Sequence, residues 1–305
     1  MRNRWLIALA AIGLHISIGS VYAWSVLTRP IMVDMGFTLS QTTWTFSLAI
    51  LMLGLSAGFL GSFAEKIGPK KSGLLAMLFW VAGLFGTAYA LSIHNLTLLY
   101  LFYGIIGGIG LGIGYITPVS TLVKYFPNRP GFATGLAIMG FGFAALIAGP
   151  LMQYLVAHVG LVNNFIILGI TYLIVMSASS LYLKAPTPKE PTRSNQDKST
   201  MYVHNHGMLA NDAMKTWQFS ALWWVFFVNI TCGIGLLSLA SPMAQETIGM
   251  TPAAAASLVG IIGIFNGGGR IVWSTISDFL GRAQTYILFF IMEIIAFYLL
   301  SQTNS

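Results

Sequence analysis

Nine long apolar runs constrain this chain more than any other feature of its sequence. A run of about 20 apolar residues can cross the hydrocarbon of a bilayer as a helix, and isolated strands cannot satisfy their backbone hydrogen bonds there. Charged residues make up 8% of the chain, far below the roughly 25% of soluble domains. We therefore predict an all-α, multi-pass membrane protein. The predicted helices lie approximately at residues 5–29, 44–64, 72–92, 97–123, 131–156, 163–183, 219–244, 253–277 and 284–301.

The basic residues predict how these helices are oriented. All but two of the 15 Lys and Arg lie on one side of the predicted membrane, whereas Arg29 lies on the other side and Arg270 lies inside a helix. Cytoplasmic loops are enriched in Lys and Arg. We therefore predict a protein of the cytoplasmic membrane with a cytoplasmic N-terminus. The net charge of +7 then reflects membrane topology, and no nucleic-acid partner is needed to explain it.

A polar segment, residues 185–218, divides the chain. It is rich in Pro, polar groups and cations, which is typical of a flexible cytoplasmic linker. It separates a six-helix half at residues 1–184 from three helices at residues 219–305. The linker histidines His204 and His206 lack the further ligands of a metal site, so we interpret them as solvated residues and expect no metal.

Glycines in the fourth run, "YGIIGGIGLGIGY", predict close helix packing. Gly104, Gly108 and Gly112 follow one another at four-residue steps and so share one helix face. The stretch lacks the G-x-G-x-x-G spacing and the preceding strand of a nucleotide-binding loop. The sequence also has no visible catalytic triad or phosphate loop, so we expect neither an enzyme nor a cofactor.

The loop after the second run matches the loop after the eighth. The first reads "GSFAEKIGPKK" and the second reads "STISDFLGRAQ". Glu65 corresponds to Asp278, and Gly68 corresponds to Gly281 at the same offset. Such self-similarity indicates an internal repeat. A complete second copy is expected to contain three further helices.

This loop pattern resembles the signature of the major facilitator superfamily. The resemblance implies two six-helix halves around a midplane site that works by alternating access, so this chain would hold the first half and the first three helices of the second. The pattern residues would then be conformational-switch loops. They are Glu65, Gly68, Asp278, Gly281 and Arg282.

In that family the loop acid meets the N-terminus of a helix in the other half, where the helix dipole favours a carboxylate. Asp278 is then expected against the helix that begins near Gly131. Glu65 would need a helix that follows this sequence. A simpler alternative is that the two acids pair with the neighbouring cations Lys66 and Arg282.

Three other stretches look like the oxalate/formate antiporter family of organic-anion carriers, which includes monocarboxylate transporters. They are "GSVYAWSVL", "RPGFATGLAIMGFG" and "FNGGGRIVWSTISDFLGR". In that family an arginine of the eighth helix binds the substrate carboxylate, and it corresponds to Arg270. The chemistry agrees, because a guanidinium offers a planar, permanently charged fork. A charge inside the membrane costs about 2.5 to 3.5 kcal/mol and usually faces a cavity or a partner. The alternative is an arginine that snorkels to the cytoplasmic surface.

The resemblance also implies an aromatic box around the anion, with Tyr22, Trp24 and Tyr115 as its members. Trp24 fits less well, since two residues along a helix place it about 200° from Tyr22. The fifth run places Phe141 where an oxalate carrier is expected to offer a hydroxylated aromatic residue. This favours a monocarboxylate.

Two titratable residues in the predicted helices are candidates for proton coupling. His15 shares a helix face with Tyr22, and a hydrogen-bonded packing role is the alternative. Glu293 lies in the ninth run, where we expect it to be either protonated and buried or paired with a residue of the three further helices of a complete second copy.

Together these features predict a secondary active transporter of small carboxylates. The substrate would be a monocarboxylate such as lactate, pyruvate or formate, or oxalate and formate in exchange, with a proton or a counter-anion as the coupled partner. Two other classes stay open. One is a non-transporting remnant or a regulatory, partner-binding membrane protein, and the other is a channel, against which the repeat and the single midplane cation argue.

Overall fold

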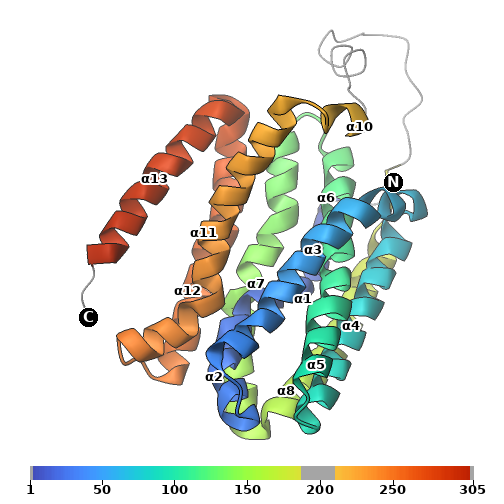
Figure 1. Cartoon of the computed structure of the whole chain (residues 1–305). Coiled ribbons are helices and arrows are strands. Elements are labelled where there is room, and N and C mark those ends of the chain that lie inside the picture. Colours follow the sequence, from blue (N-terminus) through green and yellow to red (C-terminus); the bar gives the residue numbers. More distant parts are fainter. Residues whose placement is uncertain (1–2, 187–209, 303–305) are drawn as a thin grey trace, which may run out of the picture. The chain divides into compact units, whose positions relative to one another are not determined.

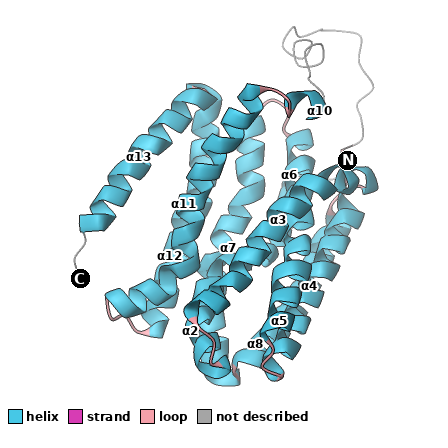
Figure 2. Ribbon diagram, viewed as in Figure 1, coloured by secondary structure: helices cyan, strands magenta, loops and turns pink. Residues whose placement is uncertain are grey.

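The computed structural model describes residues 3–186 and 210–302. Helices joined by short loops make up these ranges, as Figure 2 shows. Nine of the described helical segments are long and apolar enough to cross a membrane, which confirms the predicted fold class. In order, the elements are α1 (Arg4–Gly19), η1 (Ser20–Ala23), α2 (Trp24–Met35), α3 (Leu39–Ile67), α4 (Pro69–Ser92), α5 (Leu96–Leu99), η2 (Tyr100–Gly107), α6 (Gly108–Tyr125), α7 (Pro130–Val159), α8 (Leu161–Tyr182), α10 (Ala210–Ala213), α11 (Trp217–Thr247), α12 (Pro252–Leu280) and α13 (Arg282–Gln302).

Most helices extend a few residues beyond the predicted ends, because capping groups and not hydropathy set those ends. The first span was predicted to stop at Arg29, yet α2 continues to Met35 and ends where Gly36 adopts a φ of 68°. A left-handed residue of this kind is a common helix stop that glycine adopts without strain. Next, Thr38 and Gln41 form a reciprocal capping box that begins α3 well before the predicted residue 44.

Small residues let α6 and the segment before it lie close against α3. A Cβ on Gly104 would lie 2.8 Å from the Leu48 Cβ, and one on Gly108 would lie 2.5 Å from the Met52 Cβ. Gly112 meets the side chain of Ser56 in the same row. The predicted close-packing face is therefore present, and α3 is its partner.

An aromatic cluster fills the centre of the six N-terminal helices. Trp24 is fully buried with its ring centroid 4.3 Å from that of Tyr103. Trp80 and Phe165 approach Tyr103 at 5.6 and 6.2 Å. These ring contacts join α2, α4 and α8 (Figure 1) through η2, which carries Tyr103.

Helix α12 packs along α7 over most of its length. Glycines make this contact close, since a Cβ on Gly142 would lie 2.5 Å from the Gly267 Cα and one on Gly263 would lie 3.0 Å from the Leu146 backbone nitrogen. Small residues allow two membrane helices to approach to this distance. The polar segment precedes α12 in the chain. Through its contact with α7, α12 therefore packs against the six N-terminal helices.

Contacts divide the chain into two compact units. Residues 1–186 and 237–305 form one unit, and residues 187–236 form the other. In the described part of the second unit, Trp223 stacks on Phe227 at 5.1 Å. The predicted linker at residues 185–218 stays a prediction, because most of it, including His204 and His206, lies outside the described residues.

Candidate substrate-binding site

Arg270 lies on α12 and reaches toward the first helices of the chain. Its Nε donates to the Asn266 Oδ1 at 2.8 Å, and its Nη2 donates to the Tyr22 hydroxyl at 3.4 Å. Its Cζ lies 5.9 Å from the ring centroids of both Tyr22 and Phe141. Among the described residues, no carboxylate lies within ion-pair distance of this guanidinium. An amide and aromatic rings therefore surround the charge, and N–H donors remain for an anion.

Three aromatic residues from the N-terminal helices form a wall beside this guanidinium. Phe141 on α7 is fully buried, and the rings of Tyr22 and Tyr115 meet it edge to face at centroid distances of 4.7 and 5.4 Å. Tyr115 also interacts with Arg270. Four of the five predicted substrate-binding residues thus lie together. The wall contains two hydroxyl groups and one apolar ring.

The local backbone explains how Tyr22 reaches this wall. The helix of the first span tightens into the 3₁₀ turn η1 at Ser20–Ala23, which carries Tyr22. Just before the turn, a Cβ on Gly19 would lie 2.5 Å from the carbonyl oxygen of Phe141. Only glycine permits this approach. The first span therefore lies close enough to α7 for the rings of Tyr22 and Phe141 to touch.

His15 lies on α1, two helical turns before Tyr22, and is fully buried. Its ring contacts those of Tyr115 and Phe141. Its Nδ1 is hydrogen-bonded to the carbonyl oxygen of Ala137, and its Nε2 lies 3.1 Å from the carbonyl oxygen of Tyr115. The imidazole thus joins α1 to α7 and α6 and positions the backbone of Tyr115. Both partners are acceptors, so a neutral ring can donate to one of them and a protonated ring to both.

Trp24 and Glu293 are not part of this group. Trp24 lies in the aromatic core against Tyr103, as its angular offset from Tyr22 indicates. Glu293 lies half-buried on α13.

The Asp278 carboxylate joins α12 to the N-terminus of α7. Its Oδ2 accepts from the backbone N–H of Phe132 at 3.2 Å, and its Oδ1 accepts from the Arg282 Nη2 at 2.7 Å. The contact with a helix start and the pairing with a neighbouring cation, which the sequence left as alternatives, are both present. Gly131 leaves room for the carboxylate, since a Cβ there would lie 2.6 Å from its Oδ2. Gly281 ends α12 with a φ of 92°.

Glu65, the matching acid of the first loop, pairs with Lys124 and not with its neighbour Lys66, whereas its expected contact with a later helix stays a prediction. Its Oε1 lies 3.1 Å from the Nζ of Lys124 on α6, and no ion pair with Lys66 is found in the described ranges. Both side chains of this pair are about half exposed, at 47% and 53%. Gly68, with a φ of 84°, ends α3 just after it.

A second polar contact joins the first span to α11. The Nη1 of Arg29 on α2 donates to the Gln245 Oε1 at 3.0 Å, and the Gln245 Nε2 donates to the Ser241 Oγ at 3.1 Å. Gln245 is buried, and Arg29 is exposed. Along the first span Arg29 follows Tyr22, whereas along α12 Asp278 follows Arg270 toward the other end of the bundle. One polar contact therefore lies on each side of the Arg270 group.

Asn266 and Gln245 were not predicted from the sequence. Asn266 lies four residues before Arg270 on the same helix face, so the i,i+4 spacing of an amide and a cation was a usable signal. Gln245 meets Arg29 from a distant part of the chain, and no local pattern marks that pair.

A family profile described as Major Facilitator Superfamily matches residues 7–304. The chain therefore belongs to the major facilitator superfamily, whose members are transporters and not enzymes. Its fold is similar to that of a crystal structure of a D-xylose–proton symporter, with a TM-score of 0.60 at 15% identity over 89% of this chain and 68% of that one. At this identity the likeness concerns the fold alone.

Curated relatives include carriers of organic anions. An uncharacterized MFS-type transporter, YhjX, of Escherichia coli is 29% identical over 93% of this chain and 68% of its own length. The oxalate:formate antiporter of Oxalobacter formigenes is 26% identical over 94% of this chain and 66% of its own length. Human monocarboxylate transporter 14 is 28% identical over 61% of this chain and 36% of its own length. The chain thus spans about two thirds of the length of the first two relatives.

Proposed function

We propose that this protein is a secondary active transporter of small carboxylates in the cytoplasmic membrane, with a cytoplasmic N-terminus, and that Arg270 binds the substrate carboxylate. The observation that carries the proposal is the guanidinium itself. It lies beside Tyr22, Tyr115 and Phe141 with no carboxylate partner in the described part of the protein. A substrate carboxylate supplies the missing negative charge.

The remaining donors define how such a ligand is held. Asn266 holds the Nε of Arg270 and the Tyr22 hydroxyl accepts from its Nη2, which leaves further N–H groups of the terminal nitrogens for a contact with carboxylate oxygens. The Tyr22 and Tyr115 hydroxyl groups can donate to the same oxygens. The buried face of Phe141 excludes water and accommodates a short apolar tail. The site is therefore suited to a small anion with one carboxylate at one end.

The charge balance favours a monocarboxylate. In the part of the chain that the structure describes, Arg270 provides one positive charge at this site, and its partners Asn266 and Tyr22 are neutral. Phe141 has no hydroxyl group for a second carboxylate. Lactate, pyruvate and formate match this site better than oxalate, which would need a second cation. Oxalate and formate exchange, which one relative's name describes, is the alternative substrate pair.

The contacts on both sides of the site support alternating access. Opening toward one side requires Asp278 to leave the N-terminus of α7, and opening toward the other requires Arg29 to release Gln245. A ligand shifts such an equilibrium only by binding one state better than the other. A carboxylate that neutralises Arg270 favours the states in which the aromatic wall closes on it. His15, which joins three helices behind the wall, is the candidate group for coupling to a proton.

Uptake of radiolabelled lactate, pyruvate, formate and oxalate into proteoliposomes tests this proposal. We expect saturable uptake of a monocarboxylate and its loss in Arg270→Ala, with Lys71→Gln as a control that removes an exposed cation far from the site. Saturable uptake that persists in Arg270→Ala would remove this residue from the mechanism. Carboxylate binding without any flux in the wild-type protein would instead support the regulatory or non-transporting alternative.

A further inference from the structure

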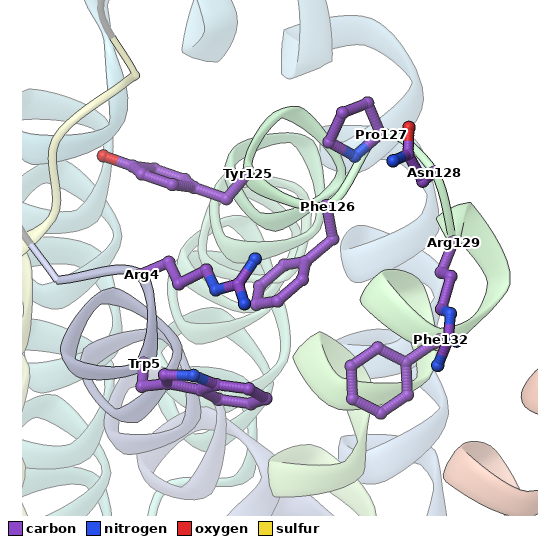
Figure 3. A pocket seen from close by; sticks show the side chains of 8 residues that line it. All are labelled: Arg4, Trp5, Tyr125, Phe126, Pro127, Asn128, Arg129 and Phe132. Atoms are coloured by element: carbon purple, nitrogen blue, oxygen red, sulfur yellow. The ribbon is translucent and has the colours of Figure 1, made fainter.

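A separate cavity of about 330 Å³ lies at the end of the bundle where the chain begins. The start of α1, the turn between α6 and α7, and the start of α7 enclose it (Figure 3). Along the first span it lies roughly 25 Å from Tyr22, at 1.5 Å per helical residue. The lining side chains that matter here are Arg4, Trp5, Phe126, Asn128, Arg129 and Phe132.

Aromatic rings form one wall of this cavity. The ring of Phe126 meets those of Trp5 and Phe132 at centroid distances of 5.5 and 6.0 Å, both edge to face. The guanidinium of Arg4 lies over Trp5 and Phe126, at 5.7 and 5.3 Å from the ring centroids. Cation–π contacts orient the guanidinium without using its N–H donors. The wall is therefore apolar, with an oriented and charged donor group above it.

The polar groups of the cavity are mainly positive. Arg129 lies across the cavity from Arg4, with Phe126 between them in Figure 3. In the parts of the chain that the structure describes, neither guanidinium has an acidic partner. The two acids near this end are engaged elsewhere, Glu65 with Lys124 and Asp278 with Arg282. Two unpaired cations at one opening favour an anion between them.

We propose that this cavity binds the headgroup of an anionic phospholipid of the cytoplasmic leaflet. A guanidinium fork matches phosphate oxygens, and basic pockets between membrane helices on the cytoplasmic side are known to take such headgroups. The inference goes beyond carboxylate transport. It rests on one part of the proposed function, namely that the N-terminus lies on the cytoplasmic side of the membrane.

The apolar surface beside the cavity distinguishes a lipid from a free anion. Trp5 and Leu9 lie four residues apart on one face of α1, and 52% and 64% of their surfaces are exposed. Tryptophan at this position is typical of the interface between headgroups and acyl chains. A phospholipid whose phosphate lies between Arg4 and Arg129 can extend an acyl chain along this face. Inorganic phosphate would leave the face uncovered.

Native mass spectrometry of the full-length protein tests the site. The protein is taken from mixed micelles with equal phosphatidylglycerol and phosphatidylcholine of the same acyl chains. We expect retained phosphatidylglycerol in the wild type and an at least tenfold loss of that preference in Arg4→Gln/Arg129→Gln. The matched control Lys70→Gln/Lys71→Gln removes the same charge from exposed cytoplasmic positions and should keep the preference.

Three results would overturn the proposal. The first is an unchanged lipid preference in the double arginine variant. The second is an equal loss in the lysine control, which would indicate general charge attraction. The third is displacement of phosphatidylglycerol by millimolar inorganic phosphate, which would indicate a free-anion site. Should the double variant fail to fold, the phosphate competition on the wild type decides, because it needs no substitution.

Discussion

Two arginine–aromatic groups lie in this bundle at different depths, and they differ in what holds the guanidinium. Arg270 is half-buried within a predicted span, and Asn266 and the Tyr22 hydroxyl bond to it directly. Arg4 lies at a helix start, is exposed, and has its guanidinium over the rings of Trp5 and Phe126. Water and salt screen the second group far more than the first. We therefore expect geometry to govern binding of the proposed anion at the deeper Arg270 and net charge to govern it at the exposed Arg4.

We expect the largest effect from a substitution in the α7–α12 contact, because it should displace Arg270 and leave the Arg4 group unchanged. A side chain at Gly142 would collide with the backbone of Gly267, so Gly142→Val should move α12 away from α7 and remove Arg270 from the aromatic wall. We expect complete loss of carboxylate uptake with the phosphatidylglycerol preference intact. Gly54→Val is the control, because no atom lies within 4 Å of a Cβ there. Normal uptake by Gly142→Val would contradict the conclusion that the close α7–α12 contact positions Arg270.

Replacing each arginine by lysine tests whether the guanidinium shape or the charge alone matters in each group. Arg270→Lys keeps a charge but loses the fork and the Asn266 bond, so carboxylate affinity should fall at least tenfold, or about 1.4 kcal/mol. Arg4→Lys should lower the lipid preference by less than about threefold, because an ammonium also binds phosphate as a point charge. Equilibrium binding of radiolabelled substrate measures the effect of Arg270→Lys. Retention of phosphatidylglycerol measures the effect of Arg4→Lys. Equal losses would mean that both sites depend on guanidinium geometry.

The Tyr22 hydroxyl should make a smaller contribution. It accepts from Arg270 at a long 3.4 Å, and a net hydrogen bond contributes about 1 kcal/mol. We therefore expect Tyr22→Phe to weaken substrate binding about fivefold while the ring contact with Phe141 persists. Phe141→Leu is the complementary variant, since it removes the ring and no polar group. An undiminished affinity in Tyr22→Phe would show that the ring alone matters.

A change in ionic strength should give the smallest difference between the Arg4 and Arg270 groups. Raising salt from 0.1 to 1 M shortens the Debye length from about 10 to about 3 Å. Lipid retention at the exposed Arg4 and Arg129 should then fall about threefold, whereas substrate affinity at Arg270 should change by less than twofold. Titrations in sodium chloride measure both. A stronger salt effect at Arg270 would mean that its surroundings are wetter than the burial of Tyr22 and Phe141 indicates.

Hydropathy was sufficient to predict the nine long helices of the described ranges, because a long apolar segment satisfies its backbone hydrogen bonds in a membrane by forming a helix. The helix ends were harder to predict. Gly36 extends the first span and the Thr38 capping box begins the second early, and both act through backbone geometry that hydropathy does not register.

The grouping of Arg270 with Tyr22, Tyr115 and Phe141 was predicted from a family resemblance and not from spacing. These residues come from four segments, and only packing brings them together. Local chemistry predicted other features correctly, such as the angular offset that separates Trp24 from Tyr22. It failed for Glu65, whose partner Lys124 is contributed by another helix. Contacts between sequence-distant polar residues need the fold before they can be named.

The α7–α12 contact also bears on how the chain is synthesised into the membrane. Translation proceeds from the N-terminus, so α7 and its glycine face leave the ribosome well before α12. Inserting an isolated helix with a central arginine costs about 2.5 to 3.5 kcal/mol. By then Tyr22, Phe141 and the glycine face of α7 have already been synthesised. On this order, the first six helices offer the charged helix a surface to pack against as it enters the bilayer.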